Sequence, residues 1–352
     1  MGIEETVAQI RTLDEEAKRQ ARERQDLLTK PQGSLGMLEE LSIKIAGIKG
    51  TAKPELRRKV IFTMAGDHGV VQEGVSAFPQ EVTSQMVFNF IAGGAGINVL
   101  AKHVGAEVIV VDMGVAYDFT PSSKLVDKKI AKGTKNMVKG PAMNRDEAIK
   151  AIGAGIDVFE DEFKKRSIDI VGIGDMGIGN TTASSAIAAA ISGKEVREIT
   201  GRGTGINGQV FENKVNVIKR ALEINKPSRK DPIEILAKVG GFEIGGLAGV
   251  CLAAAARGVP IVIDGFIATA GAMIAVEIAP IVRDYMIAAH KSVEAGHVTM
   301  LEHLGLSPLL DFNLRLGEGT GAALGISIAE ASVRILSEMA TFEEAGVSEG
   351  ED

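Results

Sequence analysis

The chain of 352 residues contains no tryptophan, two tyrosines and one cysteine, Cys251. A single cysteine excludes an internal disulfide, and its alanine-rich surroundings favour a buried apolar residue. No long basic block is present and the net charge is −7, which argues against non-specific binding to nucleic acids or membrane surfaces. The longest apolar region, 244–282, is interrupted by charged residues and proline, so we expect no membrane span. The lack of an apolar leader predicts a cytoplasmic protein.

Apolar residues make up 45% of the chain and glycines number 42, which indicates a folded core with many tight turns. Short apolar strands alternate with helical segments, and this order predicts an α/β fold with a mostly parallel sheet covered on both faces. The expected strands are 59–65, 107–112, 168–173 and 259–264. Ligands of such sheets bind beyond the carboxyl ends of the strands. We therefore expect four strand-end acids to gather at one edge: Asp67, Asp112, Asp175 and Asp264.

Two acidic residues are set in glycine-rich turns. Glu318 lies in the segment 316–321, and Asp175 lies in the segment 172–182. A glycine frame lets a ligand approach both the carboxylate and the backbone closely. The pair indicates a small-molecule site with a base and a phosphate cradle. The alternative is two ordinary tight turns whose acids face solvent.

The segment 172–177 also matches the G-x-G-x-x-G pattern of dinucleotide sites. Such a site needs a second strand ending in an acid about twenty residues later, and the segment 191–200 is too polar for a buried strand. The turn is therefore interpreted as a phosphate site at a helix start. In the next glycine loop, 201–205, Arg202 is a candidate phosphate partner together with Lys214 on the following helix. The alternative is a solvated pair of basic residues.

Other chemistries have weak support in the sequence. His290, His297 and His303 are spread without tight metal-ligand spacing, so we expect no metal site. Asp67 and His68 are adjacent and suggest an acid–base pair or metal ligands. The sequence lacks a nucleophile elbow, a Walker loop and a cysteine pair, so nothing indicates a covalent serine or cysteine mechanism.

Taken together, several segments resemble one family along nearly the whole chain, the nicotinate-nucleotide–dimethylbenzimidazole phosphoribosyltransferases. The matching segments are 30–36, 65–70, 74–83, 172–182, 265–271 and 315–321. The resemblance implies transfer of the ribosyl 5-phosphate of nicotinate mononucleotide to 5,6-dimethylbenzimidazole. The products would be nicotinate and α-ribazole 5′-phosphate, with inversion at C1′. The alternatives are a dinucleotide-dependent oxidoreductase that uses the loop 172–177, and a non-catalytic nucleotide- or base-binding module.

The resemblance also implies roles for individual residues. Glu318 matches the catalytic glutamate and is assigned as general base. Asp175 stands where the best-known members carry glutamate, so its shorter side chain leaves its role open between base and positioning. Residues assigned to the phosphate and ribose are Gly177, Gly179, Asn180, Thr181, Gly203 and Lys214. Residues assigned to the flat base are Phe78, Gln85, Met176 and Leu316, and the three apolar ones have the alternative of being simple core.

The family fold implies a Rossmann-like sheet domain and a small helical domain made from both chain ends. We place the small domain at residues 1–30 and 325–352, and the large catalytic domain at 31–324. Family members are typically homodimers, so a homodimer is expected here. The reaction needs no cofactor, because nicotinate mononucleotide already carries a cationic leaving group.

Overall fold

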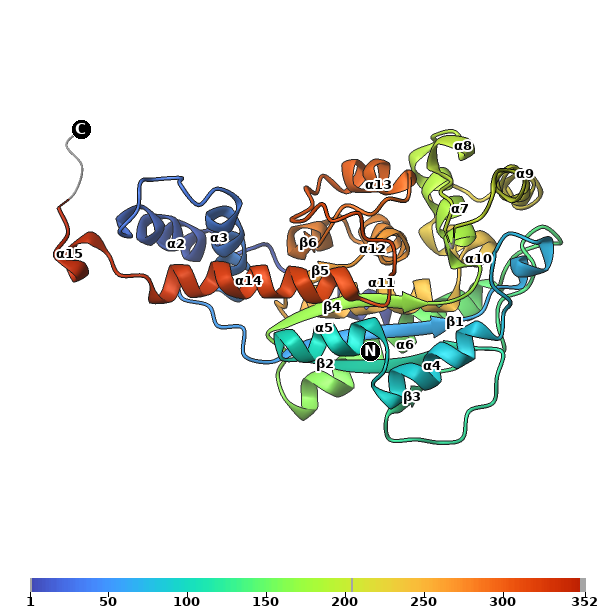
Figure 1. Ribbon diagram of the computed structural model, residues 1–352, viewed down its shortest axis with the longest axis horizontal. Helices are drawn as coiled ribbons and strands as arrows, with labels where there is room; N and C mark the ends of the chain where they lie inside the picture. Colours follow the sequence, from blue (N-terminus) through green and yellow to red (C-terminus); the bar gives the residue numbers. More distant parts are fainter. Residues whose placement is uncertain (1, 204, 349–352) are drawn as a thin grey trace.

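The structure is a computed structural model that describes residues 2–203 and 205–348. Its centre is a six-stranded sheet in the order β3-β2-β1-β4-β5-β6, in which every neighbouring pair is parallel (Figure 1). The strands are β1 (Lys59–Gly66), β2 (Ala106–Gly114), β3 (Leu125–Asp127), β4 (Ile170–Met176), β5 (Ile261–Ile263) and β6 (Met286–Ala288). The predicted parallel α/β fold and its four strands are confirmed. The edge strands β3 and β6 were not predicted, because each is short and neither lies in a longer apolar run that ends in an acid, as the equally short β5 does.

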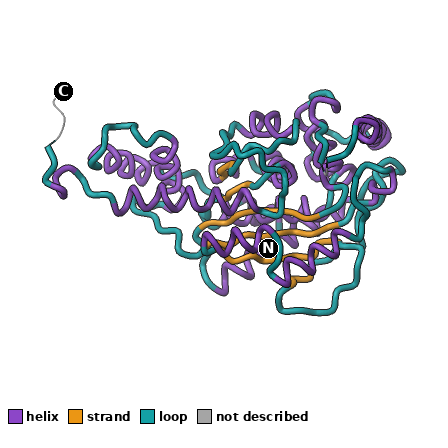
Figure 2. The backbone as a smooth tube through the Cα atoms, in the orientation of Figure 1, coloured by secondary structure: helices purple, strands orange, loops and turns teal. Residues whose placement is uncertain are grey.

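Helices surround the sheet and form most of the molecule (Figure 2). In chain order they are α1 (Ile3–Val7), α2 (Glu15–Leu27), α3 (Met37–Lys49), α4 (Val82–Ala92), α5 (Gly96–Val104), α6 (Arg145–Lys165), α7 (Asn180–Ser192), α8 (Val196–Ile199), α9 (Gly208–Asn225), α10 (Pro232–Val239), α11 (Phe242–Ala256), α12 (Phe266–Ile278), α13 (Gly296–Leu304), α14 (Thr320–Glu338) and α15 (Phe342–Ala345). Short 3₁₀ helices lie at η1 (Gly69–Glu73) and η2 (Pro280–Tyr285). The segment 191–200 contains helix α8 and no strand, as its polarity predicts.

The two faces of the sheet are covered by different helices. Side chains alternate across a strand, so Phe62 and Met64 of β1 join the core formed with α6 and α11. Ile61 and Ala65 point the other way and join the core formed with α4, α5 and α14. Both faces of the central strand β1 are therefore buried along its whole length, as expected for a sheet between two helical layers.

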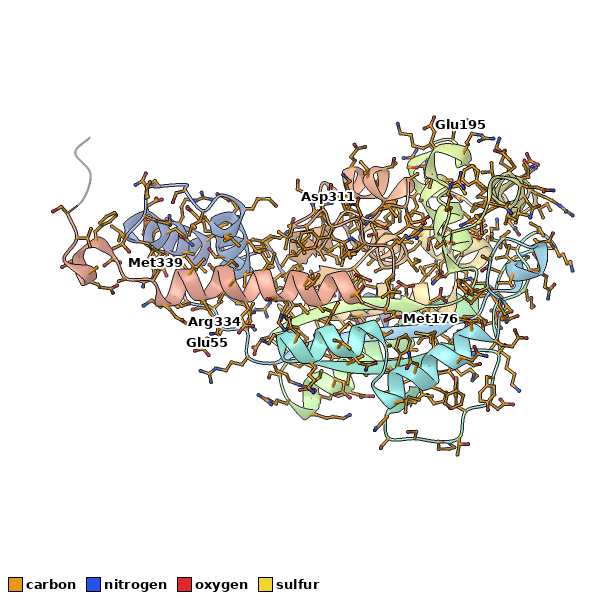
Figure 3. All side chains as sticks on the ribbon, in the orientation of Figure 1. Glu55, Met176, Glu195, Asp311, Arg334 and Met339 are labelled. Atoms are coloured by element: carbon orange, nitrogen blue, oxygen red, sulfur yellow. The ribbon has the colours of Figure 1, made fainter. Side chains whose placement is uncertain are left out.

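Helices from the N-terminal and C-terminal parts of the chain pack together at one end of the molecule, whereas α1 packs on α6 and α11. Helices α2 and α3 pack together and against the C-terminal half of α14 (Figure 1). The Arg24 guanidinium donates to the carbonyl of Leu336 at 2.7 Å, and Gln25 donates to the Ser42 hydroxyl at 2.8 Å. Figure 3 shows Arg334 and Met339 on this projecting end, whereas Met176 lies at the carboxyl end of β4. The division into residues 1–30 with 325–352 and 31–324 stays a prediction.

The strand-end acids gather at one edge, as predicted. In the register of the sheet, Asp175 of β4 lies opposite Met64 of β1, and Asp112 of β2 lies opposite Ala65. Asp264 directly follows β5, next to the same end of β4. The carboxyl edge therefore concentrates acidic groups at the centre of the sheet.

One segment of the described residues, Val82–Val104, is long and apolar enough to cross a membrane by length and composition. It consists of α4 and α5 with a break at Gly93. Because α4 packs on β1 and α5 packs on β2 and α14, these helices cover the sheet. The segment is weak evidence for a membrane location.

Candidate active site

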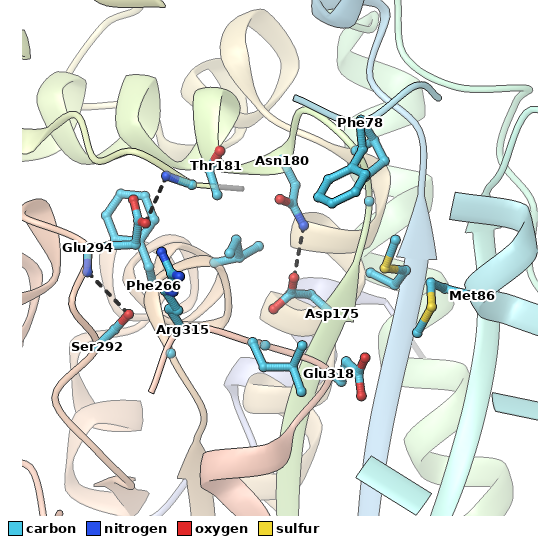
Figure 4. A pocket seen from close by; sticks show the side chains of 18 of the residues that line it. Phe78, Met86, Asp175, Asn180, Thr181, Phe266, Ser292, Glu294, Arg315 and Glu318 are labelled. Carbon is cyan, nitrogen blue, oxygen red and sulfur yellow. Dashed lines mark hydrogen bonds between the residues drawn. The ribbon is translucent and has the colours of Figure 1, made fainter. Parts of the chain in front are cut away.

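A cavity of about 400 Å³ opens at the carboxyl edge of the sheet (Figure 4). It brings together both predicted acidic residues and most of the residues assigned to the phosphate and the base. Those lining it are Glu318, Asp175, Gly177, Asn180, Thr181, Gly203, Phe78, Met176 and Leu316. The further lining residues are Val82, Met86, Ile178, Gly265, Phe266, Ile267, His290, Ser292, Glu294, Arg315 and Gly317.

Glu318 is held between two strands and the start of a helix. The backbone N–H of Glu318 donates to the Asp175 carbonyl at 3.2 Å, and the Thr63 hydroxyl donates to the Glu318 carbonyl at 2.8 Å. Glu318 has a φ of 64°, a backbone conformation that costs free energy for a non-glycine residue and is found at functional sites. Its Oε2 accepts the N–H of Ile97, in the first turn of α5, at 3.1 Å. Burial raises the Glu318 pKa, and the Ile97 N–H opposes this shift.

Glycine in β4 permits this arrangement. A Cβ placed on Gly174 would overlap the backbone of Glu318 and Gly319. A Cβ on Gly172 would lie 3.2 Å from the Ala322 side chain. These two glycines of the G-x-G-x-x-G match therefore lie inside the strand and admit α14. Gly172 and Gly174 thus serve packing inside the sheet, and a phosphate site at the turn Gly177–Gly179 stays a prediction.

Asp264 supplies the N-terminal cap of α14. The residue at the cap position is Gly319, which has no side chain to accept the free N–H groups of the first turn. Asp264 accepts them instead: the N–H of Gly319 at 3.0 Å, of Gly321 at 2.6 Å and of Ala322 at 3.1 Å. His290, which lines the cavity, lies 3.6 Å from the same carboxylate. The helix that follows Glu318 is thus anchored to the end of β5.

Asp175 is buried beside Glu318. Its Oδ2 accepts the Asn180 amide at 2.8 Å, while Oδ1 has no hydrogen-bond partner among the described residues. Burial raises the Asp175 pKa well above its ordinary range, and the neighbouring carboxylates of Asp264 and Glu243 add to this shift. These surroundings favour the protonated form of the Asp175 carboxyl group. The alternative of solvent-facing acids is wrong, because Asp175 is 5% and Glu318 is 4% exposed.

Lys214 is buried next to one end of the cavity. Its ammonium donates to the Thr181 hydroxyl at 2.8 Å and to the Gly201 carbonyl at 3.3 Å. Lys214 is 1% exposed, so the alternative of a solvated residue is wrong for it. Burial lowers its pKa to about 8, and the nearby Glu294 carboxylate opposes the shift. Arg202 instead donates to the Ile206 carbonyl at 3.1 Å.

Lys214 and Gly179 lie behind the cavity lining. Gly179, with a φ of 94°, occupies the N-cap position of α7. The backbone N–H groups of the first helical turn therefore lie directly after this glycine. Lys214 reaches the cavity through Thr181, which is both its hydrogen-bond partner and a lining residue.

The opposite end of the cavity is apolar. Phe78 is 51% and Leu316 is 60% exposed, so neither is core, and both line the cavity with Met86. Met176 is partly buried and also packs against the core. Gln85 is exposed on α4 outside the lining, whereas its neighbour Met86 faces the cavity. The role of Gln85 in base binding stays a prediction.

Several lining residues were missed by sequence reasoning. Ser292 and Glu294 follow β6, a strand that was not predicted, so the available signal was the strand-end position alone. His290 was noted only as a possible metal ligand. His303 is paired with Glu277 at 2.7 Å, and no group of three His, Cys, Asp or Glu side chains suited to a metal occurs within residues 2–203 and 205–348.

Asp67 and His68, which the sequence suggested as an acid–base pair or metal ligands, lie outside the cavity lining. His68 Nε2 lies 2.6 Å from Glu243 Oε1, and both side chains are buried. Burial disfavours a charged imidazole, but the Glu243 carboxylate outweighs it and the His68 pKa is raised. Asp67 accepts the N–H of Ala116 at 2.8 Å. None of the three lines the cavity.

Comparison with known proteins gives a consistent result over nearly the whole chain. A family model described as phosphoribosyltransferase matches residues 10–347. The nicotinate-nucleotide–dimethylbenzimidazole phosphoribosyltransferase of Geobacter metallireducens is 57% identical over 350 residues, which are 99% of each chain. The enzyme of the same name from Desulforudis audaxviator is also 57% identical, again over 99% of each chain.

Solved structures agree with the fold. The crystal structure of CobT from Thermus thermophilus superimposes with a TM-score of 0.92 at 46% identity and covers 95% of this chain and 100% of its own. A second structure from the same organism, of nicotinate-nucleotide–dimethylbenzimidazole phosphoribosyltransferase, gives a TM-score of 0.91 at 45% identity. It covers 96% of this chain and 100% of its own.

Proposed function

Because this chain belongs to the nicotinate-nucleotide–dimethylbenzimidazole phosphoribosyltransferase family, we propose that it transfers the ribosyl 5-phosphate of nicotinate mononucleotide to 5,6-dimethylbenzimidazole. The bond from C1′ to the pyridinium nitrogen breaks, and nicotinate leaves with the electron pair. A bond from C1′ to an azole nitrogen forms with inversion from β to α, and the azole N–H proton passes to the enzyme. The enzyme must therefore supply a base, an anion site and alignment of two flat rings.

Glu318 is the base in this proposal. Supporting this role, its carboxylate lines the cavity, and burial raises its pKa toward the range useful at neutral pH. The backbone N–H of Ile97, at the start of α5, donates to the Glu318 carboxylate and favours its ionised form. A base placed in this way contributes a rate factor of about 10²–10⁴.

Asp175 acts as a neutral acid. Two adjacent carboxyl groups whose environments differ take different protonation states. The carboxylates of Asp264, Glu243 and Glu318 add to the effect of burial on the Asp175 pKa, whereas the Ile97 N–H opposes that effect at Glu318. We assign the proton at rest to Asp175 and the charge to Glu318. Asp175 then donates a hydrogen bond toward the substrate from Oδ1, the oxygen without a partner among the described residues. The aspartate side chain is one methylene shorter than glutamate, which suits a hydrogen-bond donor that stays at the cavity wall and does not reach the reacting azole.

The observation that carries the proposal is the polarity of the cavity. One end holds Lys214, Thr181 and the first turn of α7, which suit a phosphate. The other end exposes Phe78 and Leu316, which suit flat aromatic rings. Asp175 and Glu318 line the same cavity, and Figure 4 shows Asp175 between Asn180 and Glu318. Holding two reactants in line in this way contributes about 7–11 kcal/mol.

The test is a reaction of the purified protein with nicotinate mononucleotide and 5,6-dimethylbenzimidazole, in which nicotinate and α-ribazole phosphate are both quantified. We expect equal amounts of the two products. Nicotinate without ribazole phosphate would replace the proposal with hydrolysis. Absence of both products with any azole would favour the alternative of a non-catalytic binding module.

The proposal extends to assembly and location. Phe88, Tyr117 and Phe119 form an aromatic cluster with ring centroids 5.0–5.5 Å apart. Phe88 and Tyr117 are exposed, and an exposed apolar patch of this kind supports self-association as a homodimer. Light scattering of the eluted protein would give twice the chain mass of 37.0 kDa. The substrates are small molecules, and we place the enzyme in the cytoplasm.

A further inference from the structure

One buried carboxylate in the cavity has no part in the proposed proton transfer. Glu294 is 7% exposed and lies in the turn between β6 and α13. Its Oε1 accepts the N–H of Gly203 at 2.9 Å. Its Oε2 is buried and has no hydrogen-bond partner among the described residues. A buried oxygen left in this state costs free energy unless a ligand satisfies it.

The turn that carries Glu294 is fixed by His297. The backbone N–H of Ser292 donates to His297 Nδ1 at 2.8 Å, so Nδ1 carries no proton. The proton is therefore on Nε2, which donates to the Thr269 hydroxyl at 2.9 Å. That hydroxyl donates in turn to the Gly265 carbonyl at 2.7 Å. Burial lowers the His297 pKa to about 3, so this arrangement persists at neutral pH.

The charge on Glu294 decides what it can bind. Burial raises its pKa, while Lys214, the Gly203 N–H and Arg315 oppose the shift. Oε1 already accepts an N–H, and the second oxygen of a carboxylate accepts hydrogen bonds as well, so a donor is the ligand that suits Oε2. A phosphate at Lys214 would be repelled by it. The remaining donors of a ribosyl 5-phosphate are the hydroxyls of the sugar, and carboxylates bind ribose hydroxyls in other nucleotide sites.

We propose that Glu294 binds the ribose hydroxyls, the 2′-hydroxyl included, and selects ribose over 2′-deoxyribose. In Figure 4 Glu294 and Ser292 lie at the same end of the cavity as Thr181, across from Glu318. The sugar of a nucleotide lies one methylene from its phosphate, so a phosphate near Thr181 and Lys214 places the ribose beside Glu294. This inference rests on the proposed function, because it takes nicotinate mononucleotide as the ligand.

The test compares the dissociation constants of nicotinate mononucleotide and its 2′-deoxy analogue by calorimetry. A hydrogen bond to a charged group is worth a factor of about ten to one hundred in affinity, so the native protein should prefer the ribonucleotide by that factor. In Glu294→Gln the preference should fall to about threefold or less, through weaker binding of the ribonucleotide. Glu302→Gln, an exposed residue of α13, should keep the native preference.

Two results would overturn the inference. One is a native preference retained in Glu294→Gln. The other is tighter binding of both nucleotides and of inorganic phosphate by Glu294→Gln, which would make Glu294 a competitor of the phosphate. If Glu294→Gln does not fold, Glu294→Asp replaces it in the test. This variant keeps the charge, and we expect its preference for the ribonucleotide to lie between the native factor and no preference. Native transfer activity, measured separately, reports on the proposed function, so failure of the two can be distinguished.

Discussion

The backbone N–H of Glu318 donates to the carbonyl oxygen of Asp175 at 3.2 Å. This bond joins the end of β4 to the turn before α14, although the two residues are far apart in the sequence. Because the Glu318 carbonyl also accepts the Thr63 hydroxyl, the turn is tied to β1 as well. The two acidic groups are therefore held by the rigid centre of the sheet, where small displacements are resisted.

Replacement of Asp175 by Asn should stabilise the protein at high pH. The Asp175 pKa is raised by burial, so its contribution to stability is fully present below the unfolded pKa of about 3.9. That contribution is lost as pH rises through the folded pKa. The melting temperature of Asp175→Asn should exceed that of the native protein most at pH 8–9, and the difference should shrink toward pH 4.

The control for this comparison is Asp26→Asn, an exposed residue of α2, which should follow the native curve. A melting temperature of Asp175→Asn that falls below the native value at pH 8–9 would contradict the assignment of a neutral Asp175. The same variant keeps a donor and an acceptor, so it should retain more transfer activity than Asp175→Ala.

Binding of nicotinate mononucleotide should weaken above pH 8. Burial lowers the Lys214 pKa to about 8, and its ammonium group donates to the Thr181 hydroxyl. Below pH 8 it is charged and binding is constant. Above pH 8 it loses its proton, so the dissociation constant should rise by about tenfold for each pH unit. Calorimetry between pH 6.5 and 9.5 measures this dependence.

Two controls isolate the phosphate in this measurement. Nicotinate riboside, which lacks the phosphate, should show no rise above pH 8. Lys214→Met should bind nicotinate mononucleotide about ten- to one-hundredfold more weakly at pH 7, with a flat profile. A profile in Lys214→Met that still rises above pH 8 would assign the titration to another group.

Gly174→Ala should damage both stability and activity. Its Cβ would overlap the backbone of Glu318 and Gly319, so the turn must move away from β4. Overpacking of this kind costs about 1–3 kcal/mol, and displacement of the base should lower turnover. The matched control is Gly153→Ala in α6, where a Cβ meets nothing within 4 Å.

In a helix interior alanine is favoured over glycine by about 0.5–1 kcal/mol, so Gly153→Ala should be neutral or stabilising. Urea unfolding and the transfer rate compare the two variants. Equal stability of Gly174→Ala and Gly153→Ala would show that the close approach of α14 to β4 is not required.

The sequence predicts the sheet well because its central strands are apolar and end in acids. β1 and β4 follow this pattern, and their parallel pairing brings Asp175 to the edge where Glu318 lies. The short strands β3 and β6 lack a longer apolar run that ends in an acid, the pattern by which the equally short β5 was predicted. The residues after β6, Ser292 and Glu294, were therefore missed as parts of the site.

The roles of the glycines could not be separated from the sequence. Gly174 and Gly177 belong to one motif, yet Gly174 admits the turn of Glu318, and Gly177 lines the cavity. Their difference depends on the approach of α14, which starts more than 140 residues later. Contacts between such distant segments are set by packing, which a local pattern does not encode.

The most direct test of the account is a single-turnover measurement on Glu318→Gln. The amide cannot take the azole proton, so the rate of ribosyl transfer should fall by about 10²–10⁴. The dissociation constant of nicotinate mononucleotide should change by less than about threefold, because Gln keeps the size of the side chain. The control Glu223→Gln, exposed on α9, should react at the native rate. A native single-turnover rate in Glu318→Gln would contradict the account and remove this residue from the proton transfer.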